Sequence, residues 1–217
     1  MTTAPKAAAV LFALTLLTAS CTRVVDGRSV AGPDLAGGAA SGASAAECEE
    51  VDAPLTDIDT QAAGEPILRI PQPQGWTRNT MLDSELIRFA MSNPELGTEE
   101  FAPTAVVTLE TAPGEQDPEL VFENQREALE TGLGATNISS EKHTLCGLPA
   151  ETIHYQMPQM GGLEPHPAIV VGAVLHTETK TFVAAVTVQT TDPDNPGYQR
   201  DAETIIKGFQ ILPPGAS

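Results

Sequence analysis

Two apolar stretches in the C-terminal half of the chain decide the fold class: "AIVVGAVL" (Ala168–Leu175) and "FVAAVTV" (Phe182–Val188). Both are apolar on either face of a strand, which is typical of central strands that are covered on both sides of a sheet. The residues "ETK" (Glu178–Lys180) lie between the two runs and predict a tight connection. We therefore expect an antiparallel hairpin in the middle of a sheet.

Further strands are predicted on the N-terminal side of this hairpin from alternating or β-branched runs bounded by Gly, Pro and Asn. With the two hairpin strands, the predicted strands are Ile67–Ile70, Glu85–Asn93, Thr104–Ala112, Ala135–Thr144, Ala150–Met157, Ala168–Thr177 and Thr181–Thr190.

A helix is predicted to begin at Pro118, because Asp117 can cap it and Glu119 suits the positive end of its dipole. We expect Arg126 and Glu130 to pair on its outer face. Gly132 and Gly134 are expected to end it. Its predicted inner face consists of Val121, Phe122, Ala128 and Leu129.

A second helix is predicted at about Tyr198–Lys207, with Ala202, Ile205 and Ile206 facing inwards. The order is therefore strands, helix, four strands, helix. Helices and strands do not alternate strictly, which disfavours a parallel doubly wound sheet. We expect the α+β class, with a twisted antiparallel β-sheet flanked by helices.

The N-terminus resembles a bacterial lipoprotein signal. The apolar run Ala7–Ala19 follows Lys6 and is too short to span a bilayer, which takes about 20 residues. Cys21 follows Ala19 and Ser20, which fit the two positions before a lipidated cysteine, whereas Thr18 is a departure from that pattern. The alternative is an ordinary export signal with Cys21 present by chance. We expect lipid attachment at Cys21 through acyl chains such as palmitate, which anchors the protein on the outer face of the cell membrane.

Three segments are therefore predicted: a signal peptide (1–20), a flexible Ala/Gly/Ser tether (21–46) and one α+β domain (47–217). Whether Thr22–Val30 docks on that domain stays open. The net charge is −18, and removal of Lys6 with the signal peptide leaves −19. Such acidity excludes nucleic acid as a partner and argues against adhesion to anionic lipid headgroups.

Cys48 and Cys146 remain after Cys21 is assigned to lipid. Two leftover thiols in an exported protein most often form a disulfide. The alternative, a metal site built from Cys146 and His143, is disfavoured because two ligands do not make a structural zinc site. No metal and no cofactor is expected.

No catalytic constellation is recognisable in the sequence. A nucleophile elbow, a phosphate-binding loop and a His-Glu-x-x-His motif are all absent. We expect His154 on a half-exposed strand position, His166 in a loop between two prolines, and His176 in a surface contact. The only tryptophan, Trp76, is expected at the edge of the core. We likewise expect four apolar residues of the hairpin to pack in the core: Val170, Val174, Phe182 and Val183. The alternative is that they form the wall of a lipid cavity.

The chain resembles the actinobacterial and mycobacterial LpqN/LpqT lipoprotein family. The resemblance rests on the Cys21 motif, on the tether, on the order of the elements and on "RIPQPQGWTR" (Arg69–Arg78), "AVVTLETAPG" (Ala105–Gly114) and "LCGLPAETIHYQM" (Leu145–Met157). It implies a Mog1/PsbP-like fold and a cell-envelope lipoprotein. One family member is linked to mycolate-lipid transport through an exporter of the RND type.

These observations favour a non-enzymatic, membrane-tethered module that binds an envelope transporter, a wall protein or a lipid. It would assist envelope lipid transport or wall assembly. The alternative is a lipid or glycolipid carrier with an apolar cavity, and a third reading is an unrecognised hydrolase. The sequence names neither partner nor ligand.

Overall fold

The computed structural model describes residues 47–216. The predicted signal peptide (1–20), the predicted lipid-attachment residue Cys21 and the predicted tether (21–46) lie outside the described residues. Within 47–216, no helix is long and apolar enough to cross a membrane.

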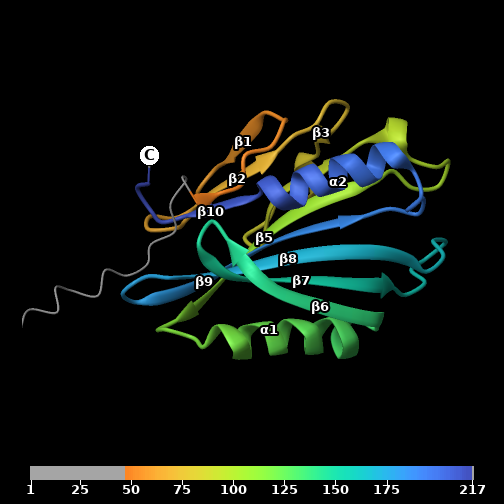
Figure 1. The fold of residues 1–217 in the computed structure, drawn as a ribbon. Helices are drawn as coiled ribbons and strands as arrows, with labels where there is room; N and C mark the ends of the chain where they lie inside the picture. Colours follow the sequence, from red (N-terminus) through yellow and green to blue (C-terminus); the bar gives the residue numbers. More distant parts are fainter. Residues whose placement is uncertain (1–46, 217) are drawn as a thin grey trace, which may run out of the picture. The chain divides into compact units, whose positions relative to one another are not determined.

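A seven-stranded sheet, antiparallel throughout, forms the middle of the domain (Figure 1). Its strands, in spatial order, are β3 (Thr77–Arg78), β4 (Ile87–Ser92), β5 (Thr104–Pro113), β9 (Lys180–Gln189), β8 (His166–His176), β7 (Leu148–Met157) and β6 (Thr136–Leu145).

A second, three-stranded sheet consists of β1 (Leu55–Ile58), β2 (Ile67–Pro71) and β10 (Gln210–Leu212) in that order. With α2 (Pro196–Gly208), it packs on one face of the large sheet, whereas α1 (Pro118–Glu127) lies against the opposite face (Figure 1). The predicted α+β fold, a twisted antiparallel sheet flanked by helices, is confirmed.

The central hairpin is confirmed, because β8 and β9 pair in antiparallel register with Ala173 opposite Ala184. Neighbouring side chains of β8 are buried on both faces: Val171 is 0% exposed and Val174 is 1% exposed. A strand that buries both faces needs no polar alternation, which is why these runs are apolar throughout.

Helix α1 begins as predicted. The Asp117 carboxylate accepts a hydrogen bond from the Glu119 backbone N–H, and Pro118 occupies the first helical position. A π-helical segment, η4 (Ala128–Leu133), continues it, and Gly134 ends it in the left-handed conformation with φ 78°. Of the predicted inner face, Phe122 is fully buried, Val121 and Leu129 are half-buried and Ala128 is exposed.

The predicted outer pair between Arg126 and Glu130 is wrong. Arg126 instead points towards the sheet and donates from Nη1 to Glu151 Oε1 at 2.5 Å, and the Glu151 side chain is 0% exposed. A carboxylate on β7 that faces the helix attracts the guanidinium more strongly than an exposed neighbour on the same helix, because the protein interior screens charge less than water does.

Most of the large core fills the space between the seven-stranded sheet, α2 and the three-stranded sheet. Trp76 is buried there, and its Nε1–H donates to Asp201 Oδ2 at 3.0 Å. Val170, Val174 and Phe182 are buried and Val183 is half-buried, so packing is their main role.

A disulfide joins Cys48 to Cys146 across 98 sequence positions. Cys146 and Gly147 form the two-residue connection between β6 and β7, and both have positive φ (51° and 78°). Such a pair is typical of a type I′ hairpin turn. The bridge therefore fastens the first described residues to the end of a hairpin.

Candidate functional site: an apolar groove along helix α2

An apolar groove of about 400 Å³ runs between α2 and the strands β7 and β8. Its size lies within the roughly 300–1,000 Å³ of ordinary ligand pockets. Its walls include Tyr155, Ile169, Tyr198, Ala202 and Ile206. They expose far more carbon than polar surface to the space between them, so the groove suits an apolar ligand.

The position of α2 fixes one wall of this groove. Asn195 caps the helix by accepting hydrogen bonds from the backbone N–H groups of Gly197 and Tyr198. Ala202 and Ile205 are buried and hold the helix on the sheet. Ile206 lies beside this buried stripe and is only half-buried, so it faces the groove.

The two tyrosines of the chain lie on elements that border the groove. Tyr155 and Tyr198 are each 6% exposed. Burial raises the pKa of both hydroxyls to about 12, because the ionised phenolate would lose its hydration. Both side chains therefore stay neutral at physiological pH. Tyr198 lies on α2 and presents a neutral ring to the groove, whereas the Tyr155 side chain packs with Ile153 and Val170 on the other face of the sheet.

One ion pair marks the rim. Lys207 Nζ lies 2.7 Å from Glu203 Oε1, one helical turn away. The hydrogen bond from Lys207 lowers the pKa of Glu203, and the same bond raises the pKa of Lys207. The rim therefore stays zwitterionic around neutral pH.

A second recess of about 440 Å³ adjoins the groove and shares Thr152, Ile206 and Lys207 with it. It extends to the disulfide, where Cys48 and Cys146 line its other end. The two recesses together follow α2 from its first turn to its last. Tyr198 and Lys207 are nine positions apart, which corresponds to a helical rise of roughly 14 Å.

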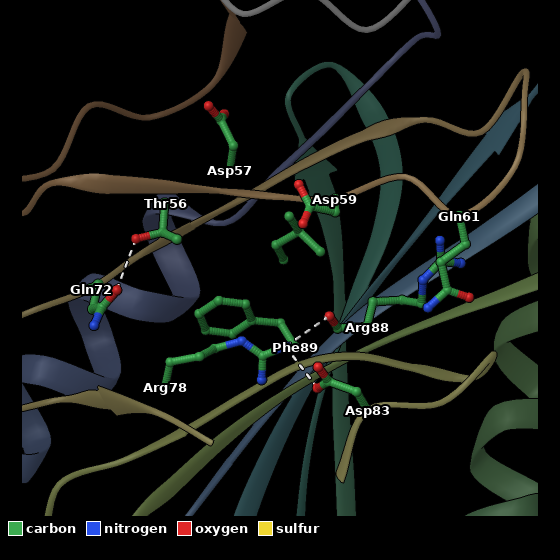
Figure 2. A pocket seen from close by; sticks show the side chains of 10 residues that line it. Thr56, Asp57, Asp59, Gln61, Gln72, Arg78, Asp83, Arg88 and Phe89 are labelled. Carbon is green, nitrogen blue, oxygen red and sulfur yellow. Dashed lines mark hydrogen bonds and ion pairs between the residues drawn. The ribbon is translucent and has the colours of Figure 1, made fainter. Parts of the chain in front are cut away.

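A different recess, also of about 400 Å³, lies between β1 and the strands β3 and β4 (Figure 2). Its lining is polar. Arg78 stacks on Phe89, with 4.2 Å from Cζ to the ring centroid, and donates to Asp83 Oδ1 at 2.7 Å. Asp59 and Gln72 also line it.

A buried ion pair fixes one side of the polar recess. Arg88 donates to both carboxylate oxygens of Glu65, at 3.1 and 2.5 Å. Burial alone would raise the pKa of Glu65, but hydrogen bonds from Arg88 and from the backbone of Gln61 and Ala62 outweigh it and lower the pKa below 4.5. Glu65 therefore stays charged and holds Arg88 in place.

The four histidines do not come together. His154 is exposed and lines the apolar groove, and His143 contacts Thr152 at 2.9 Å. His176 makes the expected surface contact, with Nε2 2.9 Å from the Gln116 carbonyl oxygen. The loop position predicted for His166 is wrong: it begins β8, is 4% exposed and lies 2.9 Å from the Glu164 carbonyl oxygen.

The described part of the chain contains no group of three or more His, Cys, Asp or Glu residues placed to hold a metal ion. The sequence predicts a bond between Cys48 and Cys146, and the structure joins them. The sequence does not predict the groove, because the groove forms where α2 crosses strands about 40 residues away in the chain. In the sequence, the adjacent pair Ile205 and Ile206 is the local signal that the apolar face of α2 is wider than one stripe. In the structure, Ile205 is buried and Ile206 is half-buried.

An antiparallel sheet between helices, with an apolar groove under α2, defines the class: an α+β domain with an apolar recess on one face. The chain belongs to the family described as "Probable lipoprotein LpqN", whose model matches residues 49–212. This confirms the predicted resemblance and shows membership of a lipoprotein family.

One solved structure supports the fold. The chain is similar to LpqN of Mycobacterium tuberculosis, whose structure is described as that of a protein involved in cell envelope biogenesis. The TM-score is 0.59 and the identity 18%, over 74% of this chain and 91% of that one. Mog1p of Saccharomyces cerevisiae (TM-score 0.45, 13% identity, 75% and 97% covered) and a point mutant of Mog1 (0.44, 14%, 74% and 97%) also match. No curated protein matches the sequence.

Proposed function

We propose that this protein is a non-enzymatic, lipid-anchored lipoprotein of the cell envelope that holds an acyl chain of an envelope lipid in the groove along α2. The observation that carries the proposal is the groove itself, an apolar recess of about 400 Å³ in a domain of a lipoprotein family. The M. tuberculosis protein of similar fold, which is described as involved in cell envelope biogenesis, supports the same setting.

The chemistry of the walls favours an alkyl chain. Ile169, Ala202 and Ile206 offer aliphatic contacts, and the Tyr198 ring offers a flat apolar wall. Each methylene group that leaves water for such a surface contributes about 0.8 kcal/mol. A chain of eight to ten methylenes would therefore gain roughly 6–8 kcal/mol before the entropy of binding is subtracted.

The charge of the domain selects the headgroup. Residues 47–217 contain 27 Asp and Glu against 8 Lys and Arg, a net charge of −19. An anionic headgroup would be repelled by this field. The ligand we propose therefore carries a neutral or zwitterionic headgroup, which lies beside the Glu203–Lys207 pair.

The anchor completes the proposal. Diacylglycerol at Cys21 and an acylated amine would retain the protein at the outer face of the membrane, and residues 21–46 would let the domain reach ligands near the bilayer. The intact mass of protein extracted from its native membrane tests this part, because lipidation adds the mass of the acyl groups. An unmodified Cys21 contradicts it.

Lipid binding is tested by native mass spectrometry of protein purified without detergent. We expect a co-purifying species with an acyl chain in the wild type and in Thr152→Val, and its loss in Thr152→Trp, which fills the groove from a half-buried strand position. Equal occupancy in both variants, or no lipid in any form, contradicts the proposal.

A second candidate is docking of an envelope transporter or wall protein. The connection between β3 and β4 exposes Met81 (90%), Leu82 (47%) and Leu86 (48%), which is unusual for so acidic a surface. Cross-linking in cells with a photoreactive residue at position 81 tests it. We expect one dominant product that Leu82→Ser and Leu86→Ser weaken, and a diffuse pattern contradicts it.

A further inference from the structure

The polar recess between β1 and the β3–β4 hairpin borders the free edge of a strand. Four consecutive residues, Thr56 to Asp59, line it. Because successive side chains of a strand point to opposite faces, a recess that touches all four borders the backbone edge as well as one face. β1 is also the outer strand of its sheet, since it pairs with β2 alone.

The register shows which backbone groups face the recess. The Gln72 N–H donates to the Pro54 carbonyl oxygen at 2.9 Å, so Pro54 and, by alternation, Thr56 and Ile58 direct their backbone groups at β2. The N–H and C=O groups of Leu55 and Asp57 therefore point away from β2. They form a free edge of four residues, about 13 Å long.

Charge identifies the kind of partner. Asp57 pairs with Arg69 at 2.8 Å and Asp83 pairs with Arg78, so these carboxylates are neutralised within the domain. Asp59 lines the recess and makes no ion pair or hydrogen bond within residues 47–216. Figure 2 shows Asp59 and Asp83 on opposite sides of Phe89 and Arg88. Among the charged side chains that line the recess, Asp59 alone has no ion pair within residues 47–216, and an occupant that brings a cation would pair with it.

We propose that β1 binds an extended, basic peptide segment of a partner protein by β-strand addition. The peptide backbone pairs with the N–H and C=O groups of Leu55 and Asp57. A Lys or Arg of the peptide lies against Asp59 on the outer face, and small apolar residues at alternate positions face Phe89.

The edge strand β6 is longer than β1 but is a poorer template. β6 is ten residues long, but a register shift between Thr136 and Ser139 interrupts its ladder. Glu141 adds a negative charge to β6 and Lys142 adds a positive one. Bulges and charged side chains are the devices by which edge strands resist pairing. The proposed site shares no lining residue with the groove along α2, so it stands independently of the lipid proposal.

The test uses a fluorescein-labelled octapeptide of alternating Lys and Val, a Glu-for-Lys peptide as the charge control, and the full chain carrying Cys21→Ala. Fluorescence anisotropy gives the affinity, and backbone amide exchange by NMR gives the position. We expect binding of the basic peptide alone, with slowed exchange of the Leu55 and Asp57 amides.

Three variants isolate the contributions. Asp57→Pro removes the outward N–H, which an edge strand tolerates, and Asp57→Ala controls for the lost ion pair with Arg69. We expect Asp57→Pro to bind about tenfold more weakly than Asp57→Ala, the effect of roughly one net hydrogen bond. Asp59→Asn should weaken binding several-fold, whereas Glu178→Gln, a distant exposed acid, should leave it unchanged.

Three results would overturn the proposal. If Asp59→Asn and Glu178→Gln lose the same amount of affinity, the basic peptide is attracted by the overall negative charge of the domain and not by Asp59. Equal affinity of the proline and alanine variants at position 57 would mean that the edge is not used. Slowed exchange at Ser139–His143 in place of β1 would put the peptide on β6.

Discussion

The pair between Arg126 and Glu151 offers a strong test of how α1 is held on the sheet. Glu151 is 0% exposed and its Oε2 has no hydrogen-bond partner in the described part of the chain, so Arg126 supplies its only charged contact. Removing one partner of a buried pair typically costs about 3–5 kcal/mol, because the other charge stays buried without compensation. We therefore expect Arg126→Met to destabilise the domain by roughly 3 kcal/mol.

Replacing the other partner, in Glu151→Leu, should destabilise the domain much less. The Arg126 side chain is 31% exposed, so in Glu151→Leu it can turn into water. Leucine fills a similar volume on β7, and replacing both members of a buried pair with apolar residues is often neutral or stabilising. The double variant Arg126→Met/Glu151→Leu should thus be about as stable as Glu151→Leu alone, with a coupling energy of about 2–3 kcal/mol.

The assay is urea unfolding followed by the fluorescence of Trp76, the only tryptophan, which is 2% exposed in the folded domain. Lys142→Met serves as the control, because its pair with Glu119 is exposed and worth about 1 kcal/mol at most. A loss below about 1 kcal/mol in Arg126→Met, or a double variant as unstable as that single variant, refutes the reasoning.

Three further outcomes follow from the same contacts. Reduction of the Cys48–Cys146 disulfide should lower the free energy of unfolding by up to about 4.7 kcal/mol, the chain-entropy value for a loop of 98 positions. The urea midpoint should fall, and the double variant Cys48→Ala/Cys146→Ala should reproduce the fall. An unchanged midpoint contradicts this prediction. Ultraviolet titration should show no tyrosinate near pH 10, because the pKa of Tyr155 and of Tyr198 is about 12 in the folded domain. The contribution of these pKa shifts to stability is complete below pH 10 and is lost as the pH rises through 12. Tyrosinate at pH 10 in the folded protein contradicts this prediction. The lowered pKa of Glu65 stabilises the folded domain fully above pH 4.5, and this contribution is lost as the pH falls through the pKa of Glu65 in the folded state. The urea midpoint of Glu65→Gln should therefore depend less on pH in this range than that of the wild type. Parallel curves of midpoint against pH contradict this prediction.

The elements that the sequence predicts are those whose signal is local. The apolar runs of β8 and β9 and the Asp117–Pro118 start of α1 each carry their signal within a few residues. His166 misled the prediction because two prolines flank it. Pro167, however, is only the second residue of β8, and a strand tolerates proline near its start.

The features that the sequence does not predict depend on distant partners. β1 and β10 have four and three residues, too few for a periodic pattern, and β10 becomes a strand only by pairing with β2 about 140 positions earlier. Glu151 is in phase with the buried Ile153 and Tyr155 of β7, and only the folded structure shows that Arg126 of α1 lies over it. The groove likewise exists only once α2 lies across β7 and β8.

The central claim is that the groove along α2 binds an acyl chain. Binding of the neutral fluorescent lipid cis-parinaric acid methyl ester to the full chain with Cys21→Ala, so that no anchor chain competes, tests it most directly. The account predicts saturable binding that Thr152→Val retains, that Thr152→Trp reduces at least tenfold, and that a neutral monoacylglycerol displaces. Unsaturable binding, or equal affinity in the valine and tryptophan variants, would contradict it.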